Sequence, residues 1–266
     1  MLNPASFFAL EDFPEKDIFS NCIYVWDALK QLKEYTARRI PPYMVHRCLK
    51  GGVPLQSPFI VHNKKIRSAS ECTVTFAEPA KGKLVVTENG QPLEGASVVM
   101  AGAILVGQHI SIGKGVLIES GACVKGPTII GDYSEIRHGA YIRGNCIFGQ
   151  RCVVGHATEV KHSIFLNDAK AGHFAYLGDS VLGNNVNLGA GTKCANLRFI
   201  EGTVKIRTPE GLIDSELRKI GAIMGDDCQT GCNSVTSPGT VLDQQSMLLP
   251  NTTAPSGYHK KKSLIR

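Results

Sequence analysis

Three cations recur at a fixed interval in the middle of the chain. The interval from Lys125 to Arg143 equals the interval from Arg143 to Lys161. In a solenoid whose coil has that length they would stack on one edge, with neighbouring rungs about 4.8 Å apart. Ammonium and guanidinium groups at this spacing repel one another unless water or an anion lies between them. The column therefore predicts either a solvated edge or a site for a phosphate or carboxylate, and spacing alone does not choose between them.

A six-residue repeat supplies the coil on which these cations would stack. An apolar residue recurs at every sixth position, and a small or aliphatic residue lies two positions before each one. A period of six fits neither a helix nor a simple strand, and it is typical of a parallel β-helix with three hexads per coil. Side chains two positions apart share a face of a strand, so both residues would point inward. The predicted interior series is Val106, Ile112, Ile118, Val124, Ile130, Ile136, Ile142, Phe148, Val154, Val160 and Leu166.

The repeat is interrupted twice, and irregular places in a solenoid often carry function. After Leu166 the hexads resume at Leu182, before a full coil of three hexads is complete, and we place the shortening in residues 170–176, which contain His173. Residues 196–220 break the hexads and predict a long protruding loop that covers a site. The hexads return from Met224 to Leu248 and fade after Pro255, which predicts a solvated basic tail. The expected units are an N-terminal region (1–100), the β-helix with its loop (101–253) and the tail (254–266).

Residues 1–100 have a different pattern, which predicts a small α+β region leading into a mainly β protein. Apolar side chains at helical spacing predict a helix over residues 21–39, ended by Pro41-Pro42. Strands are predicted at residues 72–76 and 83–87, with a turn at Asn89-Gly90. This region carries no catalytic motif that we can identify.

Composition places the chain among ordinary soluble proteins. It has 266 residues, a formal net charge of +6 and 43% hydrophobic residues, with charge of both signs along most of its length. No segment approaches the roughly 20 apolar residues of a membrane span, and the acidic N-terminus does not fit a signal peptide. We therefore expect a cytoplasmic protein that binds small molecules, with neither nucleic acid nor membrane as a partner. Cys146, Cys152 and Cys228 fall in the small interior positions, which predicts buried, reduced thiols.

One stretch carries a specific resemblance to a known family. It combines Lys170-Ala171-Gly172-His173 with Tyr176-Leu177-Gly178-Asp179, and continues through the run from Asn185 to Thr192 to Cys194. In these residues the chain resembles the acetyltransferase domain of the bifunctional glucosamine-1-phosphate N-acetyltransferase / N-acetylglucosamine-1-phosphate uridylyltransferase family, over roughly residues 95–253. The resemblance implies a left-handed parallel β-helix, which is an exception to the right-handed crossover rule. It also implies a homotrimer with active sites between subunits, acetyl-CoA as co-substrate and no metal in acetyl transfer.

The resemblance also implies roles for individual residues. His173 falls on the catalytic histidine of the family, and Glu159 falls on a carboxylate able to orient it. The residues implied to bind the sugar phosphate are Arg143, Lys161, Tyr176, Asn187, Asn196 and, from the loop, Lys205. Ala190 and Cys232 fall where the family contacts acetyl-CoA, although serine is frequent at the second position.

Two departures from the family pattern bear on the substrate. After Asn196 the family commonly has Tyr-Asp-Gly, whereas this chain has Leu197-Arg198-Phe199. That version, with its longer loop, looks more like the archaeal-type sugar-1-phosphate nucleotidyltransferases with acetyltransferase domains, so the implied acceptor is glucosamine-1-phosphate or galactosamine-1-phosphate. The N-terminal region, 1–100, is too short for the nucleotidyltransferase half, so we do not expect that second activity.

The chemistry of acetyl transfer suits the implied residues. A neutral amine must attack a thioester, and a histidine can accept the proton that the amine loses. Backbone N–H groups at glycine-rich corners can stabilise the thioester oxygen as it becomes negative. Arg143 can bind a phosphate with two parallel hydrogen bonds, and Lys161 can bind it as a point charge.

We therefore expect an acetyl-CoA-dependent N-acetyltransferase that acts on a hexosamine 1-phosphate, in the synthesis of UDP-N-acetylhexosamine for envelope polymers. Two other classes stay open. One is a sugar acyltransferase that takes its acyl chain from acyl carrier protein, and the other is a non-catalytic trimeric scaffold or regulatory subunit. Zinc carbonic anhydrases share the fold, but we find no His-x4-His pair, so no metal site is expected.

Overall fold

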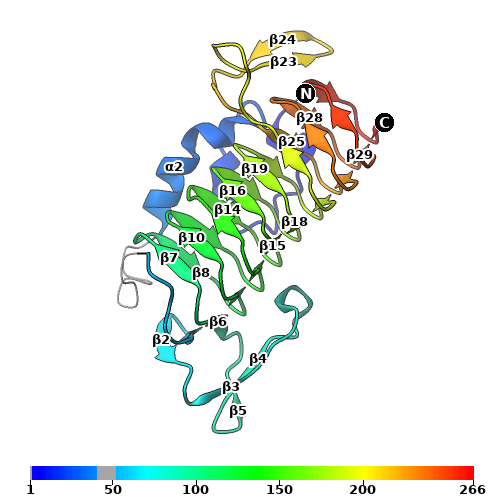
Figure 1. The fold of residues 1–266 in the computed structure, drawn as a ribbon. Helices are drawn as coiled ribbons and strands as arrows, with labels where there is room; N and C mark the ends of the chain where they lie inside the picture. The colour runs from blue at the N-terminus through cyan, green and yellow to red at the C-terminus, as the bar shows by residue number, and fades with distance from the viewer. Residues whose placement is uncertain (1, 41–51) are drawn as a thin grey trace.

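The computed structural model describes residues 2–40 and 52–266 and shows a three-sided β-solenoid with an N-terminal arm along one side (Figure 1). Successive strands lie on face 1, face 2 and face 3 in turn, and strands on each face pair in parallel with those of the neighbouring coils, except for an antiparallel hairpin at the start of face 1. The mainly β fold, a parallel β-helix of hexapeptide repeats, is therefore confirmed. Within the described ranges, none of the helices has the length and apolar character needed to cross a membrane.

The strand bounds follow the coils. Face 1 contains β1 (Phe59–His62), β2 (Lys65–Ser68), β6 (Ser97–Val99), β9 (Leu117–Ile118), β12 (Glu135–Ile136), β15 (Val153–His156), β18 (Lys170–His173), β21 (Asn187–Leu188), β26 (Gln229–Thr230), β29 (Met247–Leu248) and β32 (Leu264–Ile265). Face 2 contains β7 (Ile104–Val106), β10 (Cys123–Lys125), β13 (Tyr141–Ile142), β16 (Glu159–Lys161), β19 (Tyr176–Gly178), β22 (Lys193–Cys194), β27 (Val235–Thr236) and β30 (Thr253–Ala254). Face 3 contains β8 (Ile110–Ile112), β11 (Thr128–Ile130), β14 (Cys146–Phe148), β17 (Ser163–Phe165), β20 (Val181–Leu182), β25 (Ala222–Met224), β28 (Thr240–Leu242) and β31 (Gly257–His259).

The interior holds the aliphatic series that the repeat predicts, apart from its two ends. The residues from Ile112 to Val160 in that series are buried in one cluster. At the ends the prediction is wrong, because Leu105 replaces Val106 and Phe165 replaces Leu166 in the interior. The strand register explains both, since Val124 pairs with Leu105 and Phe148 pairs with Phe165.

The coil shortens at a different corner from the predicted one. Val160 pairs with Ile142 at the full interval of a regular coil, whereas Phe165 pairs with Phe148 at an interval that is one position shorter. The missing residue therefore falls between Val160 and Phe165, at the corner between faces 2 and 3. The next coil keeps this short corner. Leu177 pairs with Val160 and Leu182 pairs with Phe165, and the two members of each coil are equally close in sequence. The corner after His173 keeps its regular length, so our placement of the shortening in residues 170–176 is wrong.

The N-terminal arm, residues 2–40, covers face 3. It contains α1 (Pro4–Phe7), the 3₁₀ turn η1 (Lys16–Phe19) and α2 (Asp27–Arg39). Six of the face 3 strands carry an apolar side chain that points outward, and the arm and the residues packed with it bury these side chains. The outward residues in this second cluster are Ile129, Ile147, Ile164, Val181, Ile223 and Val241. The predicted helix over 21–39 begins later, at Asp27, whose carboxylate accepts the N–H groups of Ile23 and Tyr24 and holds that segment in a turn; Pro41-Pro42 lie outside the described residues.

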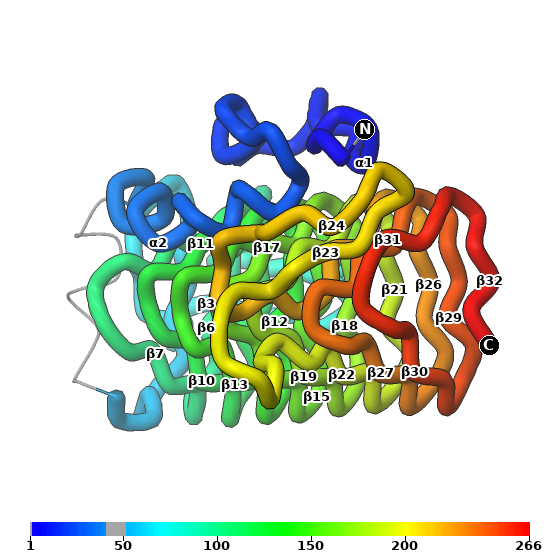
Figure 2. Tube along the Cα trace, turned by 90° about the horizontal axis from the view of Figure 1, so that it is seen from above, coloured from blue at the N-terminus to red at the C-terminus, as the bar shows by residue number. Residues whose placement is uncertain are grey.

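The other predicted segments differ in detail. Strands β3 (Cys72–Thr75), β4 (Val85–Glu88) and β5 (Gln91–Pro92) form an antiparallel sheet, with the predicted turn at Asn89-Gly90, and η3 (Pro79–Lys81) is a short 3₁₀ turn. The predicted loop at 196–220 contains a hairpin, β23 (Lys205–Thr208) and β24 (Gly211–Asp214), which runs along the same side of the solenoid as the arm (Figure 2). The predicted tail is instead a further stretch of solenoid, because β31 and β32 pair with β28 and β29.

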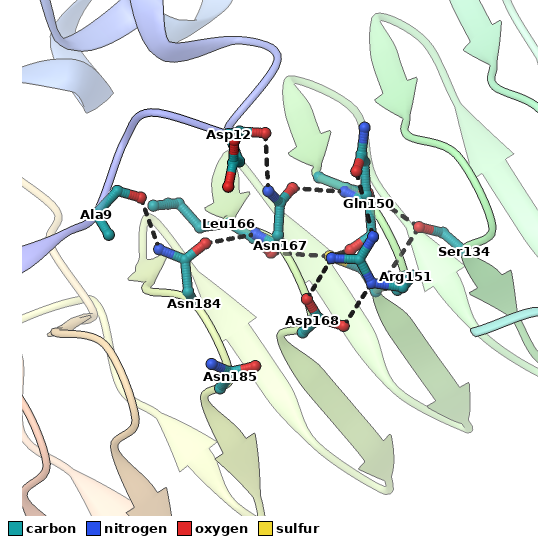
Figure 3. Close-up of polar contacts among 12 residues, drawn as sticks. Ala9, Asp12, Ser134, Gln150, Arg151, Leu166, Asn167, Asp168, Asn184 and Asn185 are labelled. Carbon is teal, nitrogen blue, oxygen red and sulfur yellow. Dashed lines mark hydrogen bonds and ion pairs between the residues drawn. The ribbon is translucent and has the colours of Figure 1, made fainter. Parts of the chain in front are cut away.

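A ladder of polar side chains fastens the arm to the corner between faces 3 and 1 (Figure 3). The Asn167 amide donates to the Asp12 carbonyl at 3.0 Å, and the Asn184 amide donates to the Ala9 carbonyl at 2.9 Å. Asp226 completes the ladder, because its carboxylate accepts the N–H groups of Ala9 at 2.8 Å and of Asn184 at 2.7 Å. Burial raises the pKa of Asp226, and these hydrogen bonds oppose the rise.

Replacing Asp226 with alanine is expected to loosen the arm. The N–H groups of Ala9 and Asn184 would lose their acceptor, which typically costs about 1–3 kcal/mol of stability when the groups are buried. Denaturant unfolding should show that loss, and limited proteolysis should cut within residues 2–40 faster. Asp227→Gly is the control, since Asp227 is exposed beside it, accepts one long bond, 3.3 Å, from Asn185, and has a φ of 62° that glycine adopts without strain. Equal behaviour of the two variants would show that the carboxylate does not hold the arm.

Candidate functional site

The predicted cation column exists at the corner between faces 2 and 3. Val124 pairs with Ile142 and Ile142 pairs with Val160, so the residues that follow them, Lys125, Arg143 and Lys161, occupy successive rungs. The equal spacing of the three cations therefore predicted this stack correctly. The column is followed on the next rung by Gly178, which pairs with Lys161 and carries no side chain that would cover its ammonium group.

Each cation of the column already has a partner in the same chain. The Lys125 ammonium donates to the Tyr141 hydroxyl at 2.8 Å and lies 5.0 Å from the centre of that ring. Arg143 forms an ion pair with Glu159 at 2.7 Å, and Lys161 forms one with Asp179 at 3.2 Å. Two of the three charges are therefore balanced before any ligand binds. Glu159 is engaged by Arg143, so one chain shows no contact that supports its implied role of orienting His173.

Asp179 is the centre of the polar network at this corner, and no role was predicted for it from the sequence. Its buried carboxylate contacts Lys161, the imidazole of His162 at 3.0 Å and the side-chain amide of Asn196. Burial alone would raise the pKa of Asp179, but the hydrogen bonds from His162 and Asn196 and the charge of Lys161 outweigh it and lower the pKa. Asp179 belongs to the motif Tyr176-Leu177-Gly178-Asp179 that carries the family resemblance. A carboxylate in that motif, which lies beside Lys161, was the signal that could have identified it.

Tyr176 and Asn196 join the same network, as the resemblance implies for acceptor-site residues. The Tyr176 hydroxyl donates to the side-chain oxygen Oδ1 of Asn196 at 3.4 Å, and Asn196 is buried. Burial raises the pKa of Tyr176, so its hydroxyl stays protonated at neutral pH and can donate to a ligand. Arg143, Lys161, Tyr176 and Asn196 therefore lie around one edge of face 2.

His173 lies at the opposite edge of face 2. It ends β18 at the corner between faces 1 and 2, and its side chain is exposed rather than directed into the interior. In the strand ladder His173 pairs with His156, whose ring stacks on that of His138 at 5.7 Å. The next residue, Phe174, has a positive φ of 51° and packs its ring against His156. The same conformation occurs at Ala157, which follows His156 on the neighbouring rung, so it belongs to the geometry of this corner.

The two residues implied to contact acetyl-CoA continue the corner from His173. The N–H of Gly191 donates to the His173 carbonyl at 2.9 Å, and the N–H of Asn233 donates to the Ala190 carbonyl at 2.7 Å. Ala190 and Cys232 are thus on the two rungs after His173, and the Cys232 thiol is exposed. His173, Ala190 and Cys232 form a continuous strip, which we call the corner strip.

Two candidate residues lie away from both edges in one chain. Asn187 is exposed on face 1, where it pairs with Lys170 and Gln229. Lys205 is exposed on β23, and the next residue, Ile206, packs into the cluster beneath the arm. The structure therefore does not bring either residue to the cation column.

The site consequently has two edges separated by one short strand. His156, which pairs with His173, and Lys161 are five residues apart, so the edges are at most about 17 Å apart along the backbone. One edge presents cations and amides that suit an anionic sugar, and the other presents the exposed imidazole of His173 beside the small side chains of Ala190 and Cys232. No group of three or more His, Cys, Asp or Glu side chains suited to a metal ion occurs in the part of the chain that the structure describes.

Fold and site together define a hexapeptide-repeat β-helix protein that is similar to sugar acetyltransferases. A family model described as the GMPPB C-terminal domain matches residues 124–248. The bifunctional sugar-1-phosphate nucleotidylyltransferase/acetyltransferase of Sulfurisphaera tokodaii is 40% identical over 90 residues, which are 34% of this chain and 22% of that protein. The bifunctional protein GlmU of Methanocaldococcus jannaschii is 42% identical over 79 residues, which are 30% of this chain and 19% of that protein.

The resemblance predicted from the sequence is therefore confirmed, including its archaeal form, and the matched segment spans about a fifth of these relatives' length. An acetyltransferase of Escherichia coli, YaiX, is 32% identical over 111 residues, which are 40% of this chain and 48% of that protein. Among solved structures, a mutant perosamine N-acetyltransferase of Caulobacter crescentus, in complex with CoA and GDP-perosamine, aligns with a TM-score of 0.29 and 17% identity over 60% of this chain and 52% of that chain.

Proposed function

We propose that this chain is an acetyl-CoA-dependent N-acetyltransferase that acts on a hexosamine 1-phosphate, either glucosamine-1-phosphate or galactosamine-1-phosphate. The observation that carries the proposal is the pair of edges on face 2. The corner strip offers a base, His173, in line with the rungs that the family uses for acetyl-CoA. The opposite edge offers Arg143 and Lys161 to a phosphate, with Tyr176 and Asn196 beside them for sugar hydroxyls.

The reaction follows from these groups. The sugar amine attacks the thioester carbon, a C–N bond forms and the C–S bond breaks. The Nε2 or Nδ1 of His173 accepts the proton that the amine loses, and the departing CoA thiolate takes up a proton. Backbone N–H groups at the corner can stabilise the oxyanion. A homotrimer belongs to the proposal, since a neighbouring subunit would close the open corner strip and complete the site.

The proposal is tested by measuring thiol release from acetyl-CoA with the full chain. Release is expected with a hexosamine 1-phosphate and at least about tenfold less with the unphosphorylated amino sugar, because a charge-assisted phosphate contact contributes about 1.5–3 kcal/mol. An acyl-carrier-protein thioester, offered in place of acetyl-CoA, tests the acyltransferase alternative. Absence of thiol release with both sugar phosphates would overturn the proposal and leave the scaffold class.

A further inference from the structure

His162 and Asp179 form a histidine–carboxylate pair of the kind that orients a base. The Nδ1 of His162 lies 3.0 Å from Oδ1 of Asp179, whose side chain is only 9% exposed. An ionised carboxylate can only accept hydrogen bonds, so Nδ1 must carry the hydrogen. In the neutral form of the ring Nε2 is then left as an acceptor, and the His162 side chain is 21% exposed, so a ligand can reach it. His173, in contrast, faces no carboxylate in the described chain.

His162 lies at the corner where the coil loses a residue, and its φ of 47° resembles that of Asn145, 51°, at the same place on the neighbouring rung. A hydrogen bond from its N–H to the Gly144 carbonyl, 3.1 Å, ties it to the rung of Arg143.

The substrate chemistry places a base here. A hexosamine 1-phosphate carries its amine on the ring carbon next to the one that bears the phosphate. A proton acceptor beside the cations that hold the phosphate is therefore close to that amine, and His162 directly follows Lys161. Such an amine arrives largely as an ammonium ion, because amines of this kind titrate near 8, as an α-amino group does (about 7.7–8.0). The nitrogen then loses two protons in the reaction, one before attack and one as the amide forms.

We propose that His162, held by Asp179, is a second catalytic base that takes the first proton from the acceptor ammonium, while His173 takes the second. The first proton leaves His162 Nε2 for solvent, and the thiolate takes up one proton, so the sum is ammonium plus thioester giving amide, thiol and one released proton. This inference rests on the proposed function. The ionisable groups around His162 are Asp179, Lys161, the Arg143–Glu159 pair on the neighbouring rung and the Cys146 thiol, whose pKa burial raises to about 12.

The test is the pH dependence of a His162→Gly variant, in which glycine suits the φ of 47° and the corner should fold. Without the base, only substrate that is already neutral can react. Since the neutral fraction of an amine that titrates near 8 is about one tenth at pH 7 and one hundredth at pH 6, thiol release should fall about 10-fold and about 100-fold respectively. At pH 9 it should return to within about threefold of wild type. Added imidazole should restore part of the loss at pH 7.

The controls separate this role from a structural one. His138→Gly removes another exposed imidazole at a different corner and should leave the pH profile unchanged, and His162→Gln should behave as His162→Gly does. A His162→Gly loss that is equal at pH 7 and pH 9, or no loss at pH 6, would overturn the inference while the proposed function stands. A wild-type chain that releases no thiol at any pH would overturn the proposed function, and this inference with it.

Discussion

A His173→Ala variant is expected to release thiol about 10²–10⁴-fold more slowly than the wild type, which is the usual contribution of a positioned general base. The loss should persist from pH 6 to pH 9, because neutralising the substrate amine in solution does not replace the proton acceptor during attack. The side chain is exposed, so truncation removes little packing, and the unfolding free energy should change by less than about 0.5 kcal/mol. Steady-state kinetics and denaturant unfolding of the same preparation check both expectations.

The control for His173→Ala is His138→Ala, two rungs away on the same corner and also exposed. It should retain the rate of the wild type, since it lies off the corner strip. Acetyl-CoA binding, measured by calorimetry in the absence of an acceptor, should be similar in both variants. Full turnover by the His173→Ala variant would show that His173 is not the general base.

The ion pairs of the cation column bear on how a phosphate could bind. The Arg143 and Glu159 side chains are 42% and 36% exposed, and ion pairs as open as this typically contribute only about 0–1 kcal/mol. A phosphate can therefore displace Glu159 from Arg143 at small cost. Lys161 and Asp179 are more enclosed, at 24% and 9%. We expect Lys161 to keep Asp179 and to offer its remaining N–H groups, so that the carboxylate stays available to His162.

The sequence predicted the interior well because the six-residue repeat arises from the burial of inward-facing side chains. Inward positions recur every six residues and tolerate only apolar or small side chains, so Ile112 through Val160 are readable without coordinates. The prediction went wrong at Leu166 because the corner lost one residue, and Leu166 is also apolar, since it packs against the arm. The sequence also contains a signal that face 3 is covered. Ile129 and Ile147 lie between two inward residues and so point outward, yet both are apolar.

The site was predicted in part for the same reason. Lys125, Arg143 and Lys161 follow from the spacing, because the coils that join them consist of three complete hexads each. The contacts of Asp179 with Lys161 and His162 depend on the shortened corner, whose place the hexads did not reveal. The hexad repeat does not predict where Asn187 and Lys205 lie relative to the cation column. Both residues project from other surfaces of the chain.

A Gly155→Ala variant is expected to lose about 3 kcal/mol or more of unfolding free energy, and its acetyl transfer with it. Gly155 in β15 lies opposite Gly172 in β18, between the pairs Val154–Ala171 and His156–His173. A Cβ added to Gly155 would overlap the backbone carbonyl of Gly172, and a strand in a closed ladder cannot move aside without breaking its hydrogen bonds. The displaced strand is the one that ends at His173, so stability and catalysis should fall together. The melting temperature should drop by about 6–12 °C, at roughly 2–4 °C per kcal/mol for a chain of this size.

Gly172→Ala provides the matched control, because the two glycines face each other but are not equivalent. A Cβ added to Gly172 meets nothing within 4 Å, and neither glycine has a left-handed φ, so backbone conformation alone penalises neither substitution. Gly172→Ala should therefore keep a melting temperature within about 3 °C of the wild type. If both variants melt alike, the close approach of β15 to β18 is not what fixes the strand. If Gly155→Ala alone is unstable, the contact between these two strands sets the position of His173.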